Sequence, residues 1–319
     1  MKASEVCSYG LKVGLSLLVA SAATVRAAVT NVFFTGFEAA EGYSALNDLA
    51  GQNGWLQAGS GGNGLVTGYF PGEGQQAYIG FAPPDAGDDL LILWKPINYQ
   101  PVAANTPVVT FSVLIGFVDS TTNLYDDFYW SVYNSSADHL FTINFRNDDL
   151  RVYYSLDGTN TFVWTGTNFT HEVAYELVIR MNFASNSWSA NLDGATLVTN
   201  KPITTTGAPL NLGDVDAAWV LANPTRAGDN FMVFDNYRIT AELESPAAPT
   251  LRLLERTPAG NVYLRLEGTS VARFAVDAST NLTHWTALRT NLLTDGFVDY
   301  LDTSAAGLNR RFYRARWVP

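Results

Sequence analysis

The chain is short of the residues that several functional classes depend on. Its single cysteine, Cys7, lies close to the N-terminus, so a disulfide framework and a cysteine nucleophile are excluded from the rest of the sequence. Charged residues make up only 15%, and no run of Lys and Arg is dense enough to follow a phosphate backbone, which argues against nucleic acid as a partner. The three histidines, His139, His171 and His284, lack the spacing of a zinc site. The chain does have 47% hydrophobic and 13% aromatic residues, enough for a large core.

The first 27 residues have the composition of a signal peptide. Lys2 and Lys12 supply a positive start, residues 13–20 form a short apolar core, and residues 25–27 resemble a small-x-small cleavage site. The apolar core is too short and too closely flanked by charge for a permanent anchor, and no second long apolar run follows. We therefore expect a bacterial protein that is secreted or held at the cell surface, extracellular or periplasmic, without membrane insertion.

The remaining sequence divides into two segments rich in predicted strands. Short apolar-polar alternations separated by Asx-Gly and related turns run through residues 28–244, and none keeps a 3.6-residue period. A Pro/Ala linker is expected at 245–250, and residues 251–319 alternate again. Residues 28–249 hold 7 Lys and Arg against 23 Asp and Glu, whereas residues 250–319 hold 9 Arg against 6 acids. The sequence predicts an all-β protein with a large antiparallel sandwich at 28–244 and a smaller β-sandwich domain at 251–319.

Alternation on the middle strands separates an apolar face from a polar, aromatic one. On residues 128–133, Phe128 and Trp130 point one way while Tyr129 and Tyr133 point the other. The candidate ligand-binding residues on this second face are Tyr129, Tyr133, Asn144, Arg146, Arg151, Tyr153, Arg180 and Asn182. Flat rings cover the apolar faces of sugars and guanidinium groups bind planar oxyanions, so the face suits a polysaccharide if these strands are neighbours. The alternative is an ordinary solvated face with cross-strand charge pairs.

Glu38 and Asp235 are the candidate metal ligands. Glu38 follows the first predicted strand and Asp235 lies within the last, and in a closed sandwich these strands are often adjacent. A hard cation would take their carboxylate oxygens, with further oxygens from Asp229 and Asn236, so we expect a structural Ca²⁺. The alternative is that both carboxylates take part only in hydrogen bonds at the strand edge.

Two short motifs identify a possible relative for the larger segment. Residues 188–194 (Trp-Ser-Ala-Asn-Leu-Asp-Gly) and residues 234–239 (Phe-Asp-Asn-Tyr-Arg-Ile), with Phe37-Glu38 and residues 51–55, resemble the concanavalin A-like lectin/glucanase superfamily in its laminin G-like form. The resemblance covers residues 31–240 and implies a jelly-roll sandwich with lectin, adhesion, hydrolase or lyase roles. The chain departs from the catalytic branches, because it lacks the paired-glutamate strand of the glucanases and the Gln-x-His strand of the alginate-lyase-like members.

The C-terminal segment has a resemblance of its own. Residues 278–282 with Trp285, and residues 311–315, resemble small immunoglobulin/fibronectin-like modules of secreted bacterial proteins. Such modules are spacers or attachment units, which implies a cell-surface or matrix partner.

Three functions therefore remain open. The first, which we prefer, is a non-catalytic glycan-binding or adhesion protein, whose arginines favour an acidic polysaccharide. The second is a divergent polysaccharide lyase or glycoside hydrolase, in which Tyr129 or Tyr153 would act with His139. The third is a structural component of an extracellular matrix or surface layer.

Overall fold

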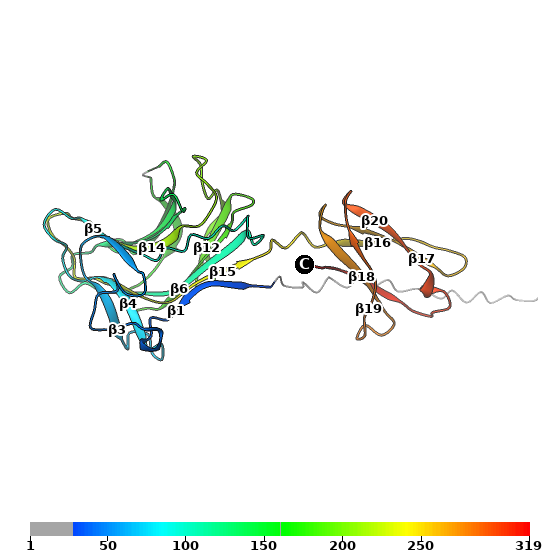
Figure 1. Ribbon diagram of the computed structural model, residues 1–319, viewed down its shortest axis with the longest axis horizontal. Helices are drawn as coiled ribbons and strands as arrows, with labels where there is room; N and C mark the ends of the chain where they lie inside the picture. The colour runs from blue at the N-terminus through cyan, green and yellow to red at the C-terminus, as the bar shows by residue number, and fades with distance from the viewer. Residues whose placement is uncertain (1–27, 160) are drawn as a thin grey trace, which may run out of the picture. The chain divides into compact units, whose positions relative to one another are not determined.

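The computed structural model describes residues 28–159 and 161–319, and the predicted signal peptide at 1–27 lies outside them. The described residues form two compact units, 28–244 and 245–319 (Figure 1). Strands dominate both units, and only two short 3-10 turns, η1 (Ala39–Glu41) and η2 (Thr303–Ala305), are helical within the described ranges. No helix in this part of the chain is long and apolar enough to cross a membrane.

The larger unit consists of two antiparallel sheets. In spatial order the first contains β13 (Ala195–Lys201), β12 (Ser187–Leu192), β11 (Tyr175–Asn182), β6 (Val108–Val118), β15 (Phe231–Glu242), β4 (Gln75–Gly80) and β3 (Asn63–Thr67), with β1 (Thr30–Thr35) also paired to β15. The second contains β10 (Val163–Asn168), β9 (Arg151–Leu156), β8 (His139–Arg146), β7 (Asp127–Tyr133), β14 (Asp214–Val220), β5 (Leu90–Trp94) and β2 (Leu56–Gly59). The predicted all-β jelly-roll sandwich is thereby confirmed.

Alternating apolar side chains from both sheets meet in one core. Phe128, Trp130 and Val132 of β7 are fully buried, as the alternation predicts. They face the other sheet, because the rings of Trp130 and Phe111 of β6 lie 5.3 Å apart between centroids. The rings of Phe141 and Trp188 stack at 3.9 Å across the same interface. Since the inner faces are filled, only the outer faces of the sheets are free for a ligand.

Strand β15 closes the larger unit. One of its edges pairs with β6, and the other edge pairs first with β4 and then with β1, so the first and last strands of this unit are adjacent, as expected. The register along β6 shifts between Asp235 and Arg238, and Asn236 has a positive φ of 52°. Such a bulge re-aims the side chains beside it, here Asp235.

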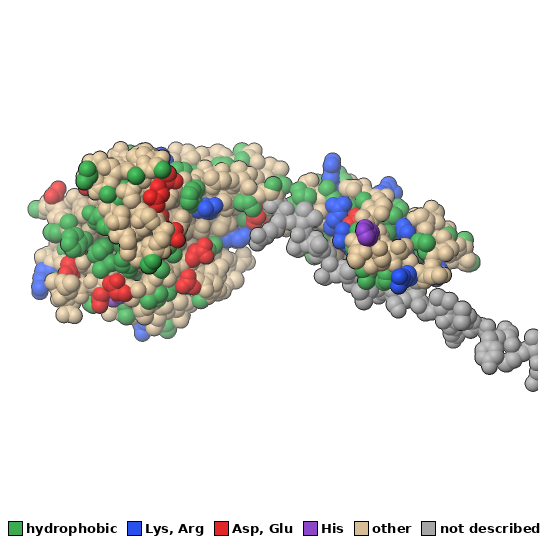
Figure 2. All heavy atoms as spheres, turned by 90° about the horizontal axis from the view of Figure 1, so that it is seen from below, with side chains coloured by type: hydrophobic (Ala, Val, Ile, Leu, Met, Phe, Trp, Pro, Cys, Tyr) green, Lys and Arg blue, Asp and Glu red, His purple; other side chains and the backbone are tan. Residues whose placement is uncertain are grey.

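The smaller unit is built from two three-stranded antiparallel sheets around its own core. The sheets are β16 (Thr250–Arg256), β17 (Val262–Glu267) and β20 (Phe297–Asp302), and β19 (Thr286–Leu292), β18 (Arg273–Ser279) and β21 (Phe312–Trp317). Buried Leu264, Leu266 and Phe274 lie in the core, and Asp277 is paired with Arg314 and Arg316. Figure 2 shows Asp and Glu side chains scattered over the larger unit and Lys or Arg side chains on the smaller one.

Candidate functional site

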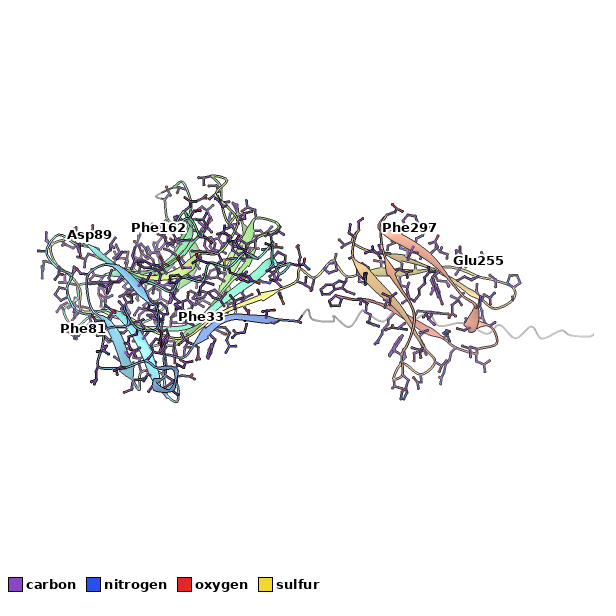
Figure 3. All side chains as sticks on the ribbon, viewed as in Figure 1. Phe33, Phe81, Asp89, Phe162, Glu255 and Phe297 are labelled. Atoms are coloured by element: carbon purple, nitrogen blue, oxygen red, sulfur yellow. The ribbon has the colours of Figure 1, made fainter. Side chains whose placement is uncertain are left out.

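The outer face of the seven-stranded sheet carries two adjoining cavities, of about 440 and 240 Å³, which together we call the groove. The two cavities share Ile92 and Tyr133, so they adjoin at these side chains. Aromatic rings line it from several strands and one loop: Trp94, Tyr129, Tyr133 and Phe162. Phe162, labelled in Figure 3, packs on Tyr129 with 5.5 Å between ring centroids. The volume of the larger cavity is in the range of small-ligand sites.

Strand pairing places small polar residues between these rings. Ser131 lies opposite Thr142 on β8 and opposite Asp216 on β14, and its hydroxyl is 2.7 Å from the Thr142 hydroxyl. Thr142 is also hydrogen-bonded to Nε2 of His139 at 2.8 Å. Ala218 lies opposite Tyr129, so a short side chain stands beside that ring. The groove therefore has a low floor with aromatic walls, a shape suited to flat, hydroxylated ligands.

Asp214 and Asp216 are the acidic groups of the groove, and both side chains lie on the same face of β14. Asp216 is only 6% exposed, and its Oδ1 atom is buried without a hydrogen-bond partner. Burial raises the pKa of Asp216 far above its usual value, and the carboxylate of Asp214 raises it further. Burial also raises the pKa of Asp214. The two carboxyl groups therefore retain a proton at neutral pH unless a cation joins them.

The remaining titratable groups of the groove are neutral at neutral pH. Burial lowers the pKa of His139, although the Asp157 carboxylate partly opposes this effect. Burial raises the pKa of Tyr129 to about 12 and also raises that of Tyr133. The ring of His139 lies 5.4 Å from that of Tyr133 between centroids, which places an unprotonated imidazole beside a phenol. The groove thus combines hydrogen-bonding groups with an acidic end.

Most of the sequence-predicted binding residues share this sheet, but only Tyr129 and Tyr133 line the groove. Asn144 lies opposite both Tyr129 and Tyr153, is 1% exposed, and has an Oδ1 atom without a partner. Arg146 and Arg151 lie 3.7 and 3.8 Å from the same Asp149 carboxylate oxygen.

The arginine side chains are also stacked on neighbouring rings. The Arg146 guanidinium lies 4.3 Å from the centroid of Tyr153, and that of Arg151 lies 4.9 Å from the centroid of Trp164. The Tyr153 hydroxyl in turn donates to Asp149 at 2.6 Å. These arginines are engaged within the protein, which weakens the expectation of an acidic ligand.

The prediction that Arg180 and Asn182 lie on the same sheet face as Tyr129 and Tyr133 is wrong. Both belong to β11, which pairs with β6 and β12 in the other sheet. Arg180 forms an ion pair with Glu242 at 3.1 Å, and Asn182 donates to Glu244 at 2.8 Å. The alternation on β11 is correct, but alternation alone does not say which strands become neighbours.

The groove also contains residues that the sequence did not single out: Leu90, Ile92, Trp94, Thr159, Phe162, Asp214 and Asp216. Asp214 and Asp216 carried a usable signal, since they alternate with buried Val215 and Ala217 as in a strand with one polar face. Phe162 and Thr159 come from a loop, and a loop sequence has no apolar-polar alternation from which the direction of a side chain could be predicted.

The candidate metal ligands Glu38 and Asp235 are brought together where β1 ends beside the bulge of β15. Asp235 is 1% exposed and its Oδ2 atom has no partner. Burial raises the pKa of Asp235 to about 7, and the charges of Glu73, Glu38 and Glu41 add to this effect. A Cβ on Gly74 would lie 1.9 Å from Oε1 of Glu38, so a glycine is required for this carboxylate to lie where it does.

These oxygens fit a hard cation in chemistry, and an orphaned buried carboxylate oxygen favours one. Within residues 28–159 and 161–319, however, no group of three or more His, Cys, Asp or Glu side chains is arranged to hold one ion. An ion bound by Glu38 and Asp235 would therefore also need main-chain, amide or water oxygens.

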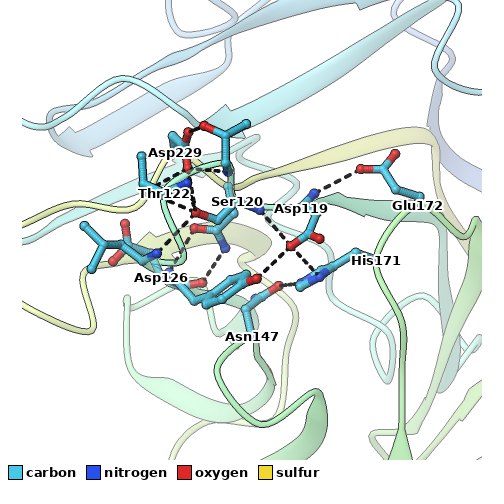
Figure 4. A network of polar contacts seen from close by, with 12 residues as sticks. Asp119, Ser120, Thr122, Asp126, Asn147, His171, Glu172 and Asp229 are labelled. Carbon is cyan, nitrogen blue, oxygen red and sulfur yellow. Dashed lines mark hydrogen bonds and ion pairs between the residues drawn. The ribbon is translucent and has the colours of Figure 1, made fainter.

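Asp229, expected to join that site, lies instead in a hydrogen-bond network between loops (Figure 4). Its carboxylate accepts hydrogen bonds from the hydroxyls of Ser120 and Thr122 at 2.6 and 3.1 Å. In the same network Asp119 lies 3.0 Å from Nδ1 of His171. Since these polar groups satisfy one another, the network holds the loops in place.

Comparison with known proteins gives similarity of fold only. No protein-family model and no curated protein matches the chain. Among solved structures, a sialidase aligns over 66% of this chain and 18% of its own, with 9% identity and a TM-score of 0.46. The CBM2 module of the evolved Dit protein of Lactobacillus casei BL23 phage J-1 aligns over 69% of this chain and 100% of its own, with 9% identity and a TM-score of 0.46. Lectin II from Ulex europaeus aligns over 68% of this chain and 100% of its own, with 9% identity and a TM-score of 0.45. The chain thus spans less than a fifth of the sialidase, and similarities this weak assign it no function.

Proposed function

We propose that this is an exported, non-catalytic protein that binds a glycan in the groove on its larger unit. The observation that carries the proposal is the groove itself, where Trp94, Tyr129, Tyr133 and Phe162 surround hydroxyl and carboxyl groups on an outer sheet face. Aromatic rings supply flat apolar surface to a pyranose, and the polar floor supplies hydrogen bonds to its hydroxyls. The predicted leader at residues 1–27 supports export, and we propose that the smaller unit attaches the protein to a surface or matrix.

Uncharged glycans fit the groove better than acidic ones. The arginines that favoured an acidic polysaccharide are paired with Asp149 and stacked on Tyr153 and Trp164. The charged side chains that line the groove are carboxyl groups, which repel uronate and sulfate.

A glycan array with the full chain, followed by calorimetry on the best ligand, tests the proposal. We expect Tyr133→Ala to weaken binding about tenfold, because Tyr133 lines both cavities and its loss removes a stacking surface. Phe81→Ala is the matched control, since Phe81 is 59% exposed and packs on Phe231 rather than in the groove. Equal glycan affinities for wild type and Tyr133→Ala, or no binding across the array, would contradict the proposal.

A polysaccharide lyase is the second candidate, favoured by the contact between His139 and Tyr133. An unprotonated imidazole can accept the proton next to a uronate carboxyl group, and a phenol can donate one to the leaving oxygen. Such a uronate would have to lie in the larger cavity, which Asp214 and Asp216 do not line. This couple replaces the pairing of His139 with Tyr129 or Tyr153 expected from the sequence. Release of unsaturated ends by wild type and not by His139→Gln would establish it, whereas binding without release leaves the non-catalytic function.

A further inference from the structure

Within residues 28–159 and 161–319, the acidic pair of the groove has no cationic partner. Two buried acids of the smaller unit do have one: Asp277 is held by Arg314 and Arg316, and Asp302 by Arg311. Among the described residues, no side-chain nitrogen of Lys, Arg or His lies within 4.0 Å of a carboxylate oxygen of Asp214 or Asp216. Buried carboxyl groups cost free energy unless they are paired, hydrogen-bonded or protonated, so the pair lacks a positive partner that a ligand can supply.

The surroundings of the pair suit an ammonium group better than a metal ion. Ca²⁺ takes six to eight oxygen ligands, whereas the smaller cavity offers two carboxyl groups among Ala58, Ile92, Trp94, Tyr133 and Ala137. A primary ammonium has three hydrogens to donate, which two carboxylates can share. It is also attracted to the faces of Trp and Tyr rings, and apolar neighbours suit the carbon that carries it.

We propose that Asp214 and Asp216 recognise a protonated primary amine on the bound glycan, so that the groove prefers a hexosamine polymer with free amino groups over its N-acetylated or neutral counterpart. This inference rests on the proposed glycan-binding function and specifies its ligand class. Binding the amine releases to solvent the proton that the pair otherwise shares, and it supplies N–H donors to the carboxyl groups of Asp214 and Asp216 that line the cavity. Acetylation removes the charge and two of the donors, and it adds bulk where the pair lies.

The test is calorimetry on the full chain at physiological salt, which screens the general attraction of polycations to an acidic protein. The probes are oligomers of glucosamine and of galactosamine, each in free-amine and N-acetylated forms. We expect a free-amine oligomer to bind about 10- to 100-fold more tightly than its N-acetylated form. The double variant Asp214→Asn/Asp216→Asn keeps the shape of the pair, and we expect it to lose this preference, so that its affinities for the free-amine and N-acetylated oligomers differ by less than about threefold.

Asp48→Asn is the matched control, because Asp48 is an exposed acid near Tyr78 of the other sheet. A similar loss of preference in Asp48→Asn would overturn the inference, since it would show general charge attraction. So would an unchanged preference in the double variant, or equal affinity of wild type for both forms. Oligolysine is added as a competitor for the bound free-amine glycan. If it competes as strongly as the glycan itself, the pair recognises the amine of a peptide, and the inference is overturned. If neither form binds and no other glycan does, the proposed function itself fails; if only the preference is missing, the groove still binds glycans.

Discussion

Replacing Asp157 with alanine is expected to lower the free energy of unfolding of the larger unit by about 3–5 kcal/mol. Asp157 follows β9 and is only 3% exposed. Its carboxylate accepts hydrogen bonds from the hydroxyls of Thr204, Thr205 and Thr206, each at 2.6 Å, and from two of their main-chain N–H groups. Alanine leaves all of these donors without their acceptor, and the hydroxyl of buried Thr204 carries the largest desolvation penalty.

The same contacts predict how this effect depends on pH. Burial by itself raises the pKa of Asp157, but the three threonine hydroxyls lower it more, so the pKa lies well below its usual value. A carboxyl group whose folded-state pKa is depressed stabilises the fold fully above its unfolded-state pKa of about 3.9. That stabilisation is lost as the pH falls through the folded-state pKa. The difference between wild type and Asp157→Ala should therefore be constant above about pH 5 and shrink in stronger acid.

Urea unfolding of the full chain, followed by tryptophan fluorescence at pH 7 and at pH 3, measures both effects. Asp148→Ala is the control, because Asp148 is an exposed acid in the turn before β9. A loss below about 1 kcal/mol for Asp157→Ala, or a loss of the same size for Asp148→Ala, would show that the threonine contacts contribute little. Since Asp157 precedes the loop that carries Thr159 and Phe162, the variant should also weaken glycan binding in the groove.

The local architecture of the larger unit could be predicted from its sequence, because the signals are local. The alternation of Phe128, Trp130 and Val132 with Tyr129 and Tyr133 fixes the two faces of β7 wherever that strand lies in the sheet. The adjacency of β1 and β15 followed from the topology of a closed sandwich. For these features the short-range pattern and the long-range structure agree.

The composition of the groove could not be predicted, because it depends on which strands are neighbours. Arg180 has the same pattern around it as Arg146, yet β11 joins the other sheet. Asp216 enters the groove only because β14, far along the chain, pairs between β7 and β5. The arginine charges at Arg146 and Arg151 were visible in the sequence, but their neutralisation by Asp149 depends on the turn conformation.

We propose that Glu38 and Asp235 bind Ca²⁺ together with main-chain, amide or water oxygens, so that adding Ca²⁺ raises the melting temperature of the larger unit. Asp235 is buried with an orphaned oxygen, and its burial and then the nearby carboxylates raise its pKa, so without a cation this corner of the fold is destabilised. A ligand at 100 times its Kd stabilises the folded state by about 2.7 kcal/mol. For a unit of this size that corresponds to about 5–10 °C.

Calorimetric scans of the full chain with Ca²⁺ and with a chelator measure the increment. Asp235→Asn should abolish it, because the amide cannot supply the charge that a hard cation requires. Asp229→Asn should lower the melting temperature in both conditions but keep the increment, since the Asp229 carboxylate is bound by Ser120 and Thr122. A rise in melting temperature that survives in Asp235→Asn would place the ion elsewhere. If wild type shows no rise at millimolar Ca²⁺, the acidic corner is a destabilising feature that protonation of Asp235 relieves. In that case stability should instead fall as the pH rises from about 4 through the Asp235 pKa of about 7, because a folded-state pKa raised above its unfolded value costs stability once the group ionises.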